Sequence, residues 1–300
     1  MKLITFAKFV LFGIDTILFK RKNPIFATMI LTDKCNLLCK HCAVNNVHSE
    51  IYSYSQIRKD MHTLFAKGVR VLSLSGGEVF LWQDGGKTLH DLVKEAKEIG
   101  FPIVTVATNG TFPIDIPEAD FILVSLDGGK EIHNLIRGNT FNKIINNIRA
   151  SKPDKVFVFM TINRLNKAEI PEVCRIAKEE KNIKAVSFNF HTPFPGTEEL
   201  TLSVSEKEQC CSVISKMIKE NFPVSNLETA FKHICHNNFP KPCHQNVVME
   251  NGNLLVCNRC IQIDGLCDQC GYFLTAEFTL MFNGNLRVIF DMLRTYLKYV

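Results

Sequence analysis

Six apolar runs of strand length alternate with helical patterns along the first two thirds of this 300-residue chain. Helical periodicity occurs near residues 54–67, 87–99, 130–150 and 167–181, and only the connection between the third and fourth runs lacks a clear helix. Parallel strands need long crossover connections, so the alternation predicts an α/β fold with a parallel sheet. Six strands are too few for a complete eight-stranded barrel. The runs lie near residues 25–31, 69–75, 102–108, 120–125, 155–162 and 184–191.

Three cysteines follow the first apolar run with the spacing CxxxCxxC, at Cys35, Cys39 and Cys42. Turn-forming residues end that run, so we expect the cysteines on a loop at the C-terminal end of a strand. Three close thiolates suit an iron–sulfur cube in which one iron is left open for chemistry. Structural zinc sites usually have four ligands and redox disulfides have two cysteines, so these alternatives explain a lone triplet less well.

Polar motifs also follow the next three apolar runs, where a parallel fold gathers its strand ends at one edge. The second run ends in Ser75-Gly76-Gly77-Glu78 and the third in Thr108-Asn109-Gly110. The fourth run ends in a longer pattern, which comprises Ser125-Leu126-Asp127-Gly128, then His133 and Arg137-Gly138.

This ordered set, with His41 just before the third cysteine, resembles the signature of the radical S-adenosylmethionine (SAM) enzymes. The resemblance covers residues 25–191 and implies a partial (β/α)6 TIM-like barrel that holds a [4Fe–4S] cluster and SAM. In that family SAM binds the open iron, and its reductive cleavage yields a 5′-deoxyadenosyl radical. The resemblance also implies an electron donor such as flavodoxin or ferredoxin.

The resemblance assigns SAM-binding roles to the motif residues. Gly76 and Gly77 would let the backbone approach the methionine amine, and Glu78 would secure either the loop or the ammonium. Arg137 would meet the SAM carboxylate with a bidentate fork, although an exposed helical arginine is an equal alternative. His41 would pack near the adenine without ligating iron, because a fourth protein ligand would close the open position.

Further candidates lie at the other strand ends. Ser125 and Asp127 can hydrogen-bond the ribose or the methionine part of SAM, and Thr108 and Asn109 can do likewise, although Asn-Gly is also a common turn. Asn163 and His191 end the fifth and sixth runs, so they would face the same mouth and contact adenine or substrate. A purely structural hydrogen bond is an equal alternative for these last two residues.

A second group of cysteines lies near the C-terminus and contains two CxxC pairs, which by spacing alone would also suit zinc. Cys243, Gly252 and Cys257 have the spacing Cys-x8-Gly-x4-Cys. This spacing resembles the opening of the SPASM or twitch extension that carries auxiliary [4Fe–4S] clusters in this family. The match is incomplete, so we expect one auxiliary cluster held by four of these five residues, with Cys235 in reserve. The five are Cys243, Cys257, Cys260, Cys267 and Cys270.

Breaker residues after the sixth run and a helix candidate at 205–220 divide the chain. We expect an N-terminal amphipathic segment (1–23), a radical SAM barrel (24–200), a bridging helix with a cysteine-rich domain (201–282) and a C-terminal amphipathic helix (283–300). The first segment is mostly apolar, contains Lys8 and Asp15, and ends in Lys20-Arg21-Lys22. It suits an interfacial helix better than a spanning one, although packing of both ends on the barrel and oligomerisation are alternatives.

Composition narrows the function classes. Twelve cysteines, eight of them in two clusters, are typical of metal sites in a reducing cytoplasm and not of a secreted disulfide protein. A net charge of +5 is dispersed along the chain, so we expect no nucleic-acid partner. The sequence therefore predicts a cytoplasmic radical SAM enzyme of oxidoreductase or transferase type, with possible peripheral contact at the membrane. Its substrate is either a peptide or a membrane-associated lipid, and the alternative is a non-catalytic iron–sulfur protein that transfers electrons or senses redox state.

Overall fold

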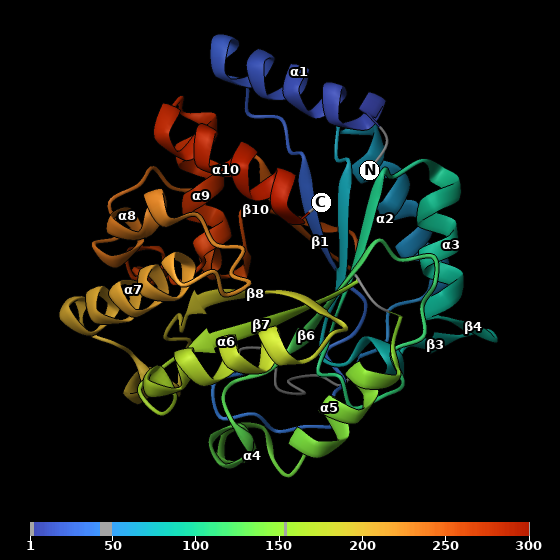
Figure 1. The fold of residues 1–300 in the computed structure, drawn as a ribbon. Coiled ribbons are helices and arrows are strands. Elements are labelled where there is room, and N and C mark those ends of the chain that lie inside the picture. The colour runs from blue at the N-terminus through green and yellow to red at the C-terminus, as the bar shows by residue number, and fades with distance from the viewer. Residues whose placement is uncertain (1–2, 43–49, 153–154, 300) are drawn as a thin grey trace.

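The computed structural model describes residues 3–42, 50–152 and 155–299, with the side chains of residues 3–8 excluded. A single eight-stranded sheet, wrapped by helices, forms its centre (Figure 1). The strands are ordered β10-β9-β1-β2-β5-β6-β7-β8, and all neighbours are parallel except β9 and β10. The strands are β1 (Phe26–Ile30), β2 (Val71–Ser75), β5 (Ile103–Thr108), β6 (Phe121–Ser125), β7 (Val156–Ile162), β8 (Ile183–Phe190), β9 (Asn246–Glu250) and β10 (Asn253–Val256).

Helices connect the parallel strands, and a small hairpin of β3 (Gln83–Asp84) and β4 (Lys87–Thr88) precedes one of them. The strand-to-strand connections contain α2 (Tyr54–Ala66), α3 (Leu89–Ile99), α4 (Lys130–Arg137), α5 (Phe141–Ala150) and α6 (Ile170–Glu179). The remaining helices are α1 (Leu3–Phe19), α7 (Val204–Lys219), α8 (Phe231–Cys235), α9 (Phe273–Phe282) and α10 (Leu286–Tyr299). Short 3-10 turns are η1 (Val79–Leu81), η2 (Lys167–Glu169), η3 (Glu198–Leu200), η4 (Glu228–Ala230), η5 (Arg259–Gln262) and η6 (Leu266–Gln269).

The predicted α/β class with six parallel barrel strands is confirmed, since each apolar run contains one of β1, β2, β5, β6, β7 and β8. The prediction of one continuous helix over 130–150 is wrong. Gly138 has a φ of 81°, outside the helical region, and separates α4 from α5. Glycine adopts such a φ at little cost, so it ends the first helix and redirects the chain.

The hairpin β9–β10 is the part of the sheet that the sequence analysis missed. It lies within the cysteine-rich segment, and β9 pairs in parallel with β1 in the register Phe26↔Asn246. Its turn is Asn251-Gly252, with φ angles of 44° and 82°, which is a strong hairpin signal between two apolar runs. The cysteine-rich segment therefore extends the barrel sheet directly.

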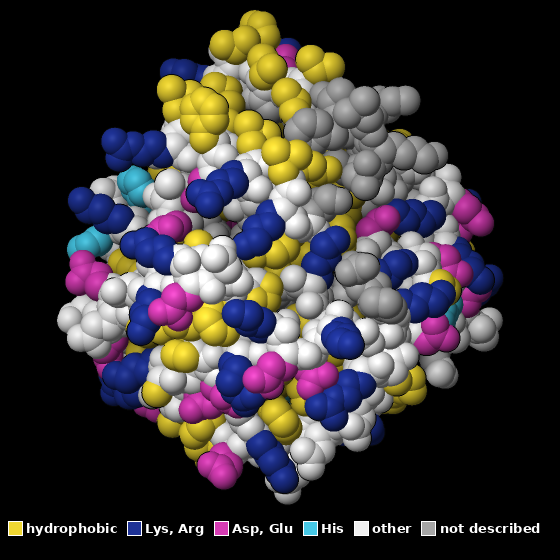
Figure 2. All heavy atoms as spheres, viewed as in Figure 1, with side chains coloured by type: hydrophobic (Ala, Val, Ile, Leu, Met, Phe, Trp, Pro, Cys, Tyr) yellow, Lys and Arg dark blue, Asp and Glu magenta, His cyan; other side chains and the backbone are white. Residues whose placement is uncertain are grey.

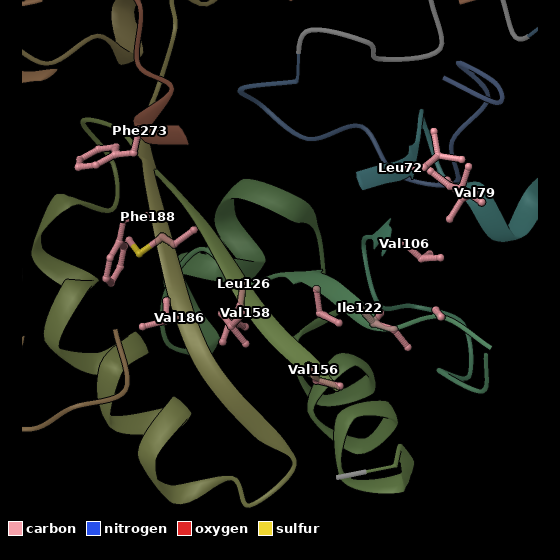
Figure 3. Close-up of a cluster of buried hydrophobic side chains, with 14 of the residues drawn as sticks. Leu72, Val79, Val106, Ile122, Leu126, Val156, Val158, Val186, Phe188 and Phe273 are labelled. Carbon is pink, nitrogen blue, oxygen red and sulfur yellow. The ribbon is translucent and has the colours of Figure 1, made fainter. Parts of the chain in front are cut away.

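The core is made by apolar side chains on the strands, which pack against the surrounding helices. Figure 3 shows Leu72, Val106, Ile122, Val158 and Phe188 from five neighbouring strands, all of them buried. Phe273, at the start of α9, joins the same cluster and is also buried. The C-terminal helices are thus anchored in the core that positions the strand ends.

The terminal helices lie at the end of the sheet where the strands start (Figure 1). Phe12 of α1 meets Phe282 of α9 edge to face at 5.9 Å, and Phe26 at the start of β1 meets Phe278 at 6.2 Å. Among the described residues, no helix is long and apolar enough to cross a membrane.

Candidate active site

The three clustered cysteines follow β1 and line one cavity of about 240 Å³ at the C-terminal ends of the strands. We call it the mouth cavity. Burial raises the pKa of Cys39 to about 11, although the nearby Arg137 charge acts in the opposite direction. Burial likewise raises the pKa of Cys35. The thiols of Cys35 and Cys39 are therefore protonated at neutral pH, and metal binding has to displace their protons.

Gly76 and Gly77 bring the loop after β2 against the start of the cysteine loop. The amide of Gly77 donates to the carbonyl of Thr32 at 2.7 Å. A Cβ on Gly76 would lie 2.2 Å from the same oxygen, and a Cβ on Gly77 would lie 2.2 Å from the carbonyl oxygen of Lys34. No side chain fits at either position, so the two glycines fix where the cysteine loop begins.

Glu78 lies behind the cavity wall and is fully buried. Its carboxylate accepts hydrogen bonds from Thr108 Oγ1 and from the Asn109 amide, both at 2.8 Å, and from the Phe80 amide at 3.2 Å. Burial raises the pKa of Glu78, and these donors counteract the rise. Glu78 thus ties the end of β2 to the end of β5, which corresponds to the loop-securing role considered for it.

Thr108 and Asn109 both line the mouth cavity. Asn109 Nδ2 donates to Asn36 Oδ1 at 2.8 Å and lies 3.8 Å from Cys35 Sγ. Asn36 in turn donates to Thr111 Oγ1 at 2.9 Å. The Asn-Gly turn after β5 therefore holds the cysteine loop from the side opposite the glycines.

Asp127 and Arg137 form a buried ion pair in which Nε donates to Oδ2 at 2.5 Å. Burial acts to raise the pKa of Asp127, but the Arg137 charge outweighs it, and the pKa lies below its ordinary value. Arg137 also lines the cavity, with Nη1 3.8 Å from Cys39 Sγ. Asp127 does not line the cavity. It positions the arginine instead, and its carboxylate also accepts a hydrogen bond from the Thr161 amide at 3.1 Å. Ser125 lines the cavity as expected.

The two candidate histidines both border the mouth cavity, with ring centres 6.5 Å apart. Burial lowers the pKa of His41 to about 4, so the ring is neutral, and its Nε2 lies 3.2 Å from Arg137 Nη2. His191 Nε2 lies 3.0 Å from Thr197 Oγ1. Asn163 is fully buried away from the cavity, where its Oδ1 accepts from the Leu165 amide at 2.9 Å in a turn.

Several cavity residues were missed by the sequence analysis. Thr161 could have been found, because it occupies the C-terminal end of a predicted strand two residues after Phe159, on the same face. Tyr272 comes from the distant segment after the second cysteine group, and no sequence pattern placed it here. The further cavity residues are Ser75, Ala107, Phe159, Asn189, Phe190, Thr192 and Phe194.

In the second cysteine group, Cys243 lies just before β9, and the other four cysteines lie between β10 and α9. Cys243, Cys257, Cys260 and Cys270 are buried, and burial raises the pKa of Cys243 to about 11 and of Cys270 to about 12. Cys257 has a φ of 72°, a left-handed conformation that is rare outside glycine and that clusters at functional sites. Cys235, the reserve ligand, lies instead with its sulfur 3.1 Å from that of Cys211 on α7.

A short segment links the second cysteine group to the mouth cavity. Gly271 accepts a hydrogen bond from the Phe190 amide at 2.9 Å and donates to Thr192 Oγ1 at 3.0 Å. A Cβ on Gly271 would lie 2.1 Å from the Phe190 carbonyl oxygen, so only glycine allows this approach. Tyr272 then lines the cavity, and burial and the neighbouring thiols of Cys260 and Cys270 raise its pKa.

The family comparison agrees with this geometry, because residues 29–177 match the radical SAM superfamily. This chain belongs to the radical SAM superfamily. The fold is similar to that of Streptococcus suis SuiB bound to precursor peptide SuiA, with a TM-score of 0.63 and 14% identity over 89% of this chain and 67% of that chain. The expected cofactors, a [4Fe–4S] cluster and SAM, are those of the superfamily, and SPASM-type members carry additional clusters.

Two curated relatives share part of their length with this radical SAM chain. The antilisterial bacteriocin subtilosin biosynthesis protein AlbA of Bacillus subtilis is 26% identical over 201 residues, which cover 62% of this chain and 44% of AlbA. The Fe-coproporphyrin III synthase of Methanosarcina barkeri is 29% identical over 231 residues, which cover 69% of this chain and 56% of the synthase. The matches thus span about half the length of these relatives.

The residues around the mouth cavity fit the superfamily's cofactors. Three thiols reach one cavity, which leaves one iron of a cube without a protein ligand. His41 Nδ1 is buried and has no hydrogen-bond partner among the described residues, so a bound ligand can supply one. Within the described ranges, no three His, Cys, Asp or Glu side chains converge in the way that a single metal ion needs.

Proposed function

We propose that this chain is a radical SAM enzyme, of oxidoreductase or transferase type, that acts on a peptide. The convergence of Cys35, Cys39 and Cys42 with the ends of β2, β5 and β6 on one cavity carries the proposal. When bound, the [4Fe–4S] cluster supplies the electron that cleaves SAM reductively to give a 5′-deoxyadenosyl radical.

In this proposal the residues of the mouth cavity divide into holding, orienting and shielding groups. The three thiolates would hold three irons of the cluster, while Gly77 and Asn109 fix the loop that carries them. Arg137 donates its Nε hydrogen bond to Asp127, which leaves Nη1 and Nη2 at the cavity, where they suit the carboxylate of SAM. Ser125 offers a hydroxyl for the polar parts of SAM, whereas the Thr108 hydroxyl donates to Glu78.

The aromatic wall of the cavity supports its use as a reaction chamber. Phe159, Phe190 and Phe194 line the side formed by β7, β8 and the loop after β8, and Tyr272 completes it. Such a wall excludes water and unwanted hydrogen donors from the neighbourhood of a radical. The hydrogen bonds of Gly271 with Phe190 and Thr192, which we call the Gly271 seam, hold Tyr272 against the rest of this wall.

Peptides are the substrate class that we favour over membrane lipids. SuiB was solved with a precursor peptide, and AlbA is named for bacteriocin biosynthesis, so peptide substrates occur among the similar proteins. The mouth cavity opens at the end of the sheet opposite α1 and α10, which carry the apolar surface of this chain. A lipid held by those helices would therefore lie far from the cysteines.

The enzymatic assignment is tested with anaerobically reconstituted protein, reduced with dithionite and incubated with SAM. We expect formation of 5′-deoxyadenosine, and we expect Cys39→Ala to abolish it. Cys174→Ala is the matched control, because Cys174 is a buried cysteine of α6 outside both groups and its loss leaves the cavity intact. If the fully loaded wild-type protein forms no 5′-deoxyadenosine, the electron-transfer or redox-sensing alternative is favoured.

The substrate class is tested by deuterium transfer. Uniformly deuterated peptides below about 10 kDa from the source cells, and deuterated lipid vesicles from the same cells, are offered separately as probes. Hydrogen abstraction from a peptide moves deuterium into 5′-deoxyadenosine, which mass spectrometry detects as a one-dalton increase. We expect the increase with the peptide fraction only. An increase with lipid vesicles alone would replace the peptide assignment with the lipid one.

We also propose that four of Cys243, Cys257, Cys260, Cys267 and Cys270 hold a second [4Fe–4S] cluster. Cys257, Cys267 and Cys270 all lie near enough to Cys260 to raise its pKa, and Cys267 also raises the pKa of Cys257, which supports a shared site. Iron and acid-labile sulfide analysis is expected to give about eight irons per chain, falling to about four in Cys260→Ala. About four irons with one zinc in the wild-type protein would favour the zinc alternative.

A further inference from the structure

An apolar groove lies at the strand-start end of the molecule, opposite the mouth cavity. It has a volume of about 310 Å³ and is walled by α1, α9 and α10, with Phe12, Phe278 and Met292 among its lining residues. Ile25 and Val71 form part of its floor. Protein interiors rarely leave apolar space of this size unfilled, and an apolar cavity takes apolar ligands. The groove therefore has the chemistry of an acyl-chain site.

The outer side of the same helices is also apolar. Leu11, Ile14 and Leu18 recur at i, i+3 and i+7 on α1 and are 65%, 49% and 70% exposed. On α10, Phe290 and Leu297 are 68% and 78% exposed. Figure 2 shows hydrophobic side chains gathered at the top of the molecule, where Figure 1 places α1 and α10. Soluble monomers seldom expose such contiguous apolar surface, so this face is built to contact something.

Basic residues border this apolar face. Lys20, Arg21 and Lys22 directly follow α1 and are exposed, and Arg294 and Lys298 are exposed on α10. A second copy of the chain, docked by a two-fold axis through this face, would bring like charges together. Anionic lipid headgroups complement the charge, while their acyl chains match the apolar stripe and the groove.

The nearby acidic residues offset only part of this charge. Asp15 is paired with Arg21 at 2.5 Å. Asp291 on α10 is held by hydrogen bonds from the amide and hydroxyl of Thr229 at 3.0 and 2.9 Å. Lys20 and Lys22 consequently retain their charge for an external partner. The face combines exposed leucines, uncompensated lysines and an apolar groove on one side of the molecule.

We propose that this face docks on an anionic membrane surface, with α1 in the interface and one lipid acyl chain in the groove. The proposal goes beyond the enzymatic function, because it concerns the end of the barrel opposite the mouth cavity. In this orientation the mouth cavity faces away from the bilayer, so that a peptide in the aqueous phase can reach it.

Vesicle flotation of the full chain tests the surface. We expect binding to phosphatidylglycerol vesicles at least tenfold stronger than to phosphatidylcholine vesicles, and weakened by salt. Leu11→Ser with Leu18→Ser, and separately Lys20→Glu with Lys22→Glu, are each expected to reduce binding at least tenfold. The matched controls are Val204→Ser and Lys181→Glu with Lys219→Glu, which alter exposed residues elsewhere and are expected to bind normally.

Gly13→Leu tests the groove. Gly13 lines it, and a Cβ there would meet no atom within 4 Å, so a leucine fills the space without a backbone conflict. With phosphatidylglycerol that carries a cis-parinaroyl chain, we expect fluorescence enhancement by the wild type and at least a fivefold loss in Gly13→Leu. The circular dichroism spectrum of the variant is expected to match that of the wild type, and its thermal midpoint is expected to be no lower.

Three outcomes would overturn the proposal. Equal binding to neutral and anionic vesicles, or none to either, would remove the anionic surface. Concentration-dependent dimerisation that Leu11→Ser with Leu18→Ser abolishes would identify the face as a contact between copies. Binding of monomeric cis-parinaric acid without vesicle binding would make the groove a site for free fatty acids. Each result is independent of SAM cleavage, so it leaves the enzymatic proposal to its own test.

Discussion

The two ends of the sheet carry cavities of similar size and opposite chemistry. Strand β2 starts at Val71 on the floor of the apolar groove and ends at Ser75 in the mouth cavity, and β5 likewise runs from Ile103 to Thr108. At the mouth, Thr108, Asn109 and Arg137 are fixed by side-chain hydrogen bonds, whereas the groove contains almost no polar atoms. One sheet therefore supports precisely positioned polar side chains at one end and an adaptable apolar surface at the other. Substitutions at the mouth are therefore expected to be costly, and those at the groove mild.

The largest expected effect is at the buried ion pair of the mouth. Arg137→Ala leaves the Asp127 carboxylate buried without its partner, and we expect a loss of about 3–5 kcal/mol in the free energy of unfolding. Arg149→Ala is the control, because its ion pair with Glu180 is on the surface, where solvent screens it, and its loss is expected to cost far less. Urea unfolding measures both. Similar losses for the two variants would contradict the buried role of Arg137.

Glu277 tests the region between the two ends, because it lies midway along α9. Burial raises the pKa of its carboxyl to about 7, although it accepts a hydrogen bond from the Leu227 amide. The folded state holds the proton more tightly than the unfolded chain, so stability is full below about pH 4.5 and falls as the pH rises to 7. We expect a loss of about 3 kcal/mol across this range.

Urea unfolding at pH 5 and at pH 7.5 checks this pH dependence. Glu277→Gln removes the titrating group, and we expect the pH-dependent loss to shrink by most of its value in that variant. An unchanged pH profile in Glu277→Gln would assign the dependence to other groups.

A glycine at the mouth is expected to tolerate no side chain. In Gly77→Ala the new Cβ would lie 2.2 Å from the Lys34 carbonyl oxygen, so the cysteine loop must shift. We expect a loss of about 1–3 kcal/mol in stability and impaired iron incorporation, measured by thermal unfolding and by iron analysis. Normal iron content in this variant would show that the loop position is adjustable.

The smallest effect is expected at the groove and has the opposite sign. Gly13 is helical and its Cβ would meet no atom within 4 Å, so Gly13→Ala removes unfolded-state freedom without a clash. We expect a gain of about 0.5–1 kcal/mol in stability. A loss from Gly13→Ala as large as that from Gly77→Ala would break the contrast between the two ends.

The fold was largely predictable because it rests on local patterns. Apolar runs that end in turn residues identified each barrel strand, and the motifs at those ends located most of the mouth cavity. Glu78 and Asp127 were harder to place, because a sequence does not tell a ligand-binding carboxylate from one that positions its neighbour. Tyr272 and the pairing of β9 with β1 depend on contacts between distant segments, for which the single sequence held only the Asn251-Gly252 turn as a signal.

The Gly271 seam also bears on the order in which the mouth cavity is assembled during synthesis of the chain. A ribosome exposes Cys35, Cys39 and Cys42 long before Gly271 and Tyr272 are synthesised. Until that late segment docks on Phe190, one wall of the mouth cavity is missing and the thiols are open to stray metals and oxygen. The last part of the chain to be synthesised therefore completes the cavity that the first part begins.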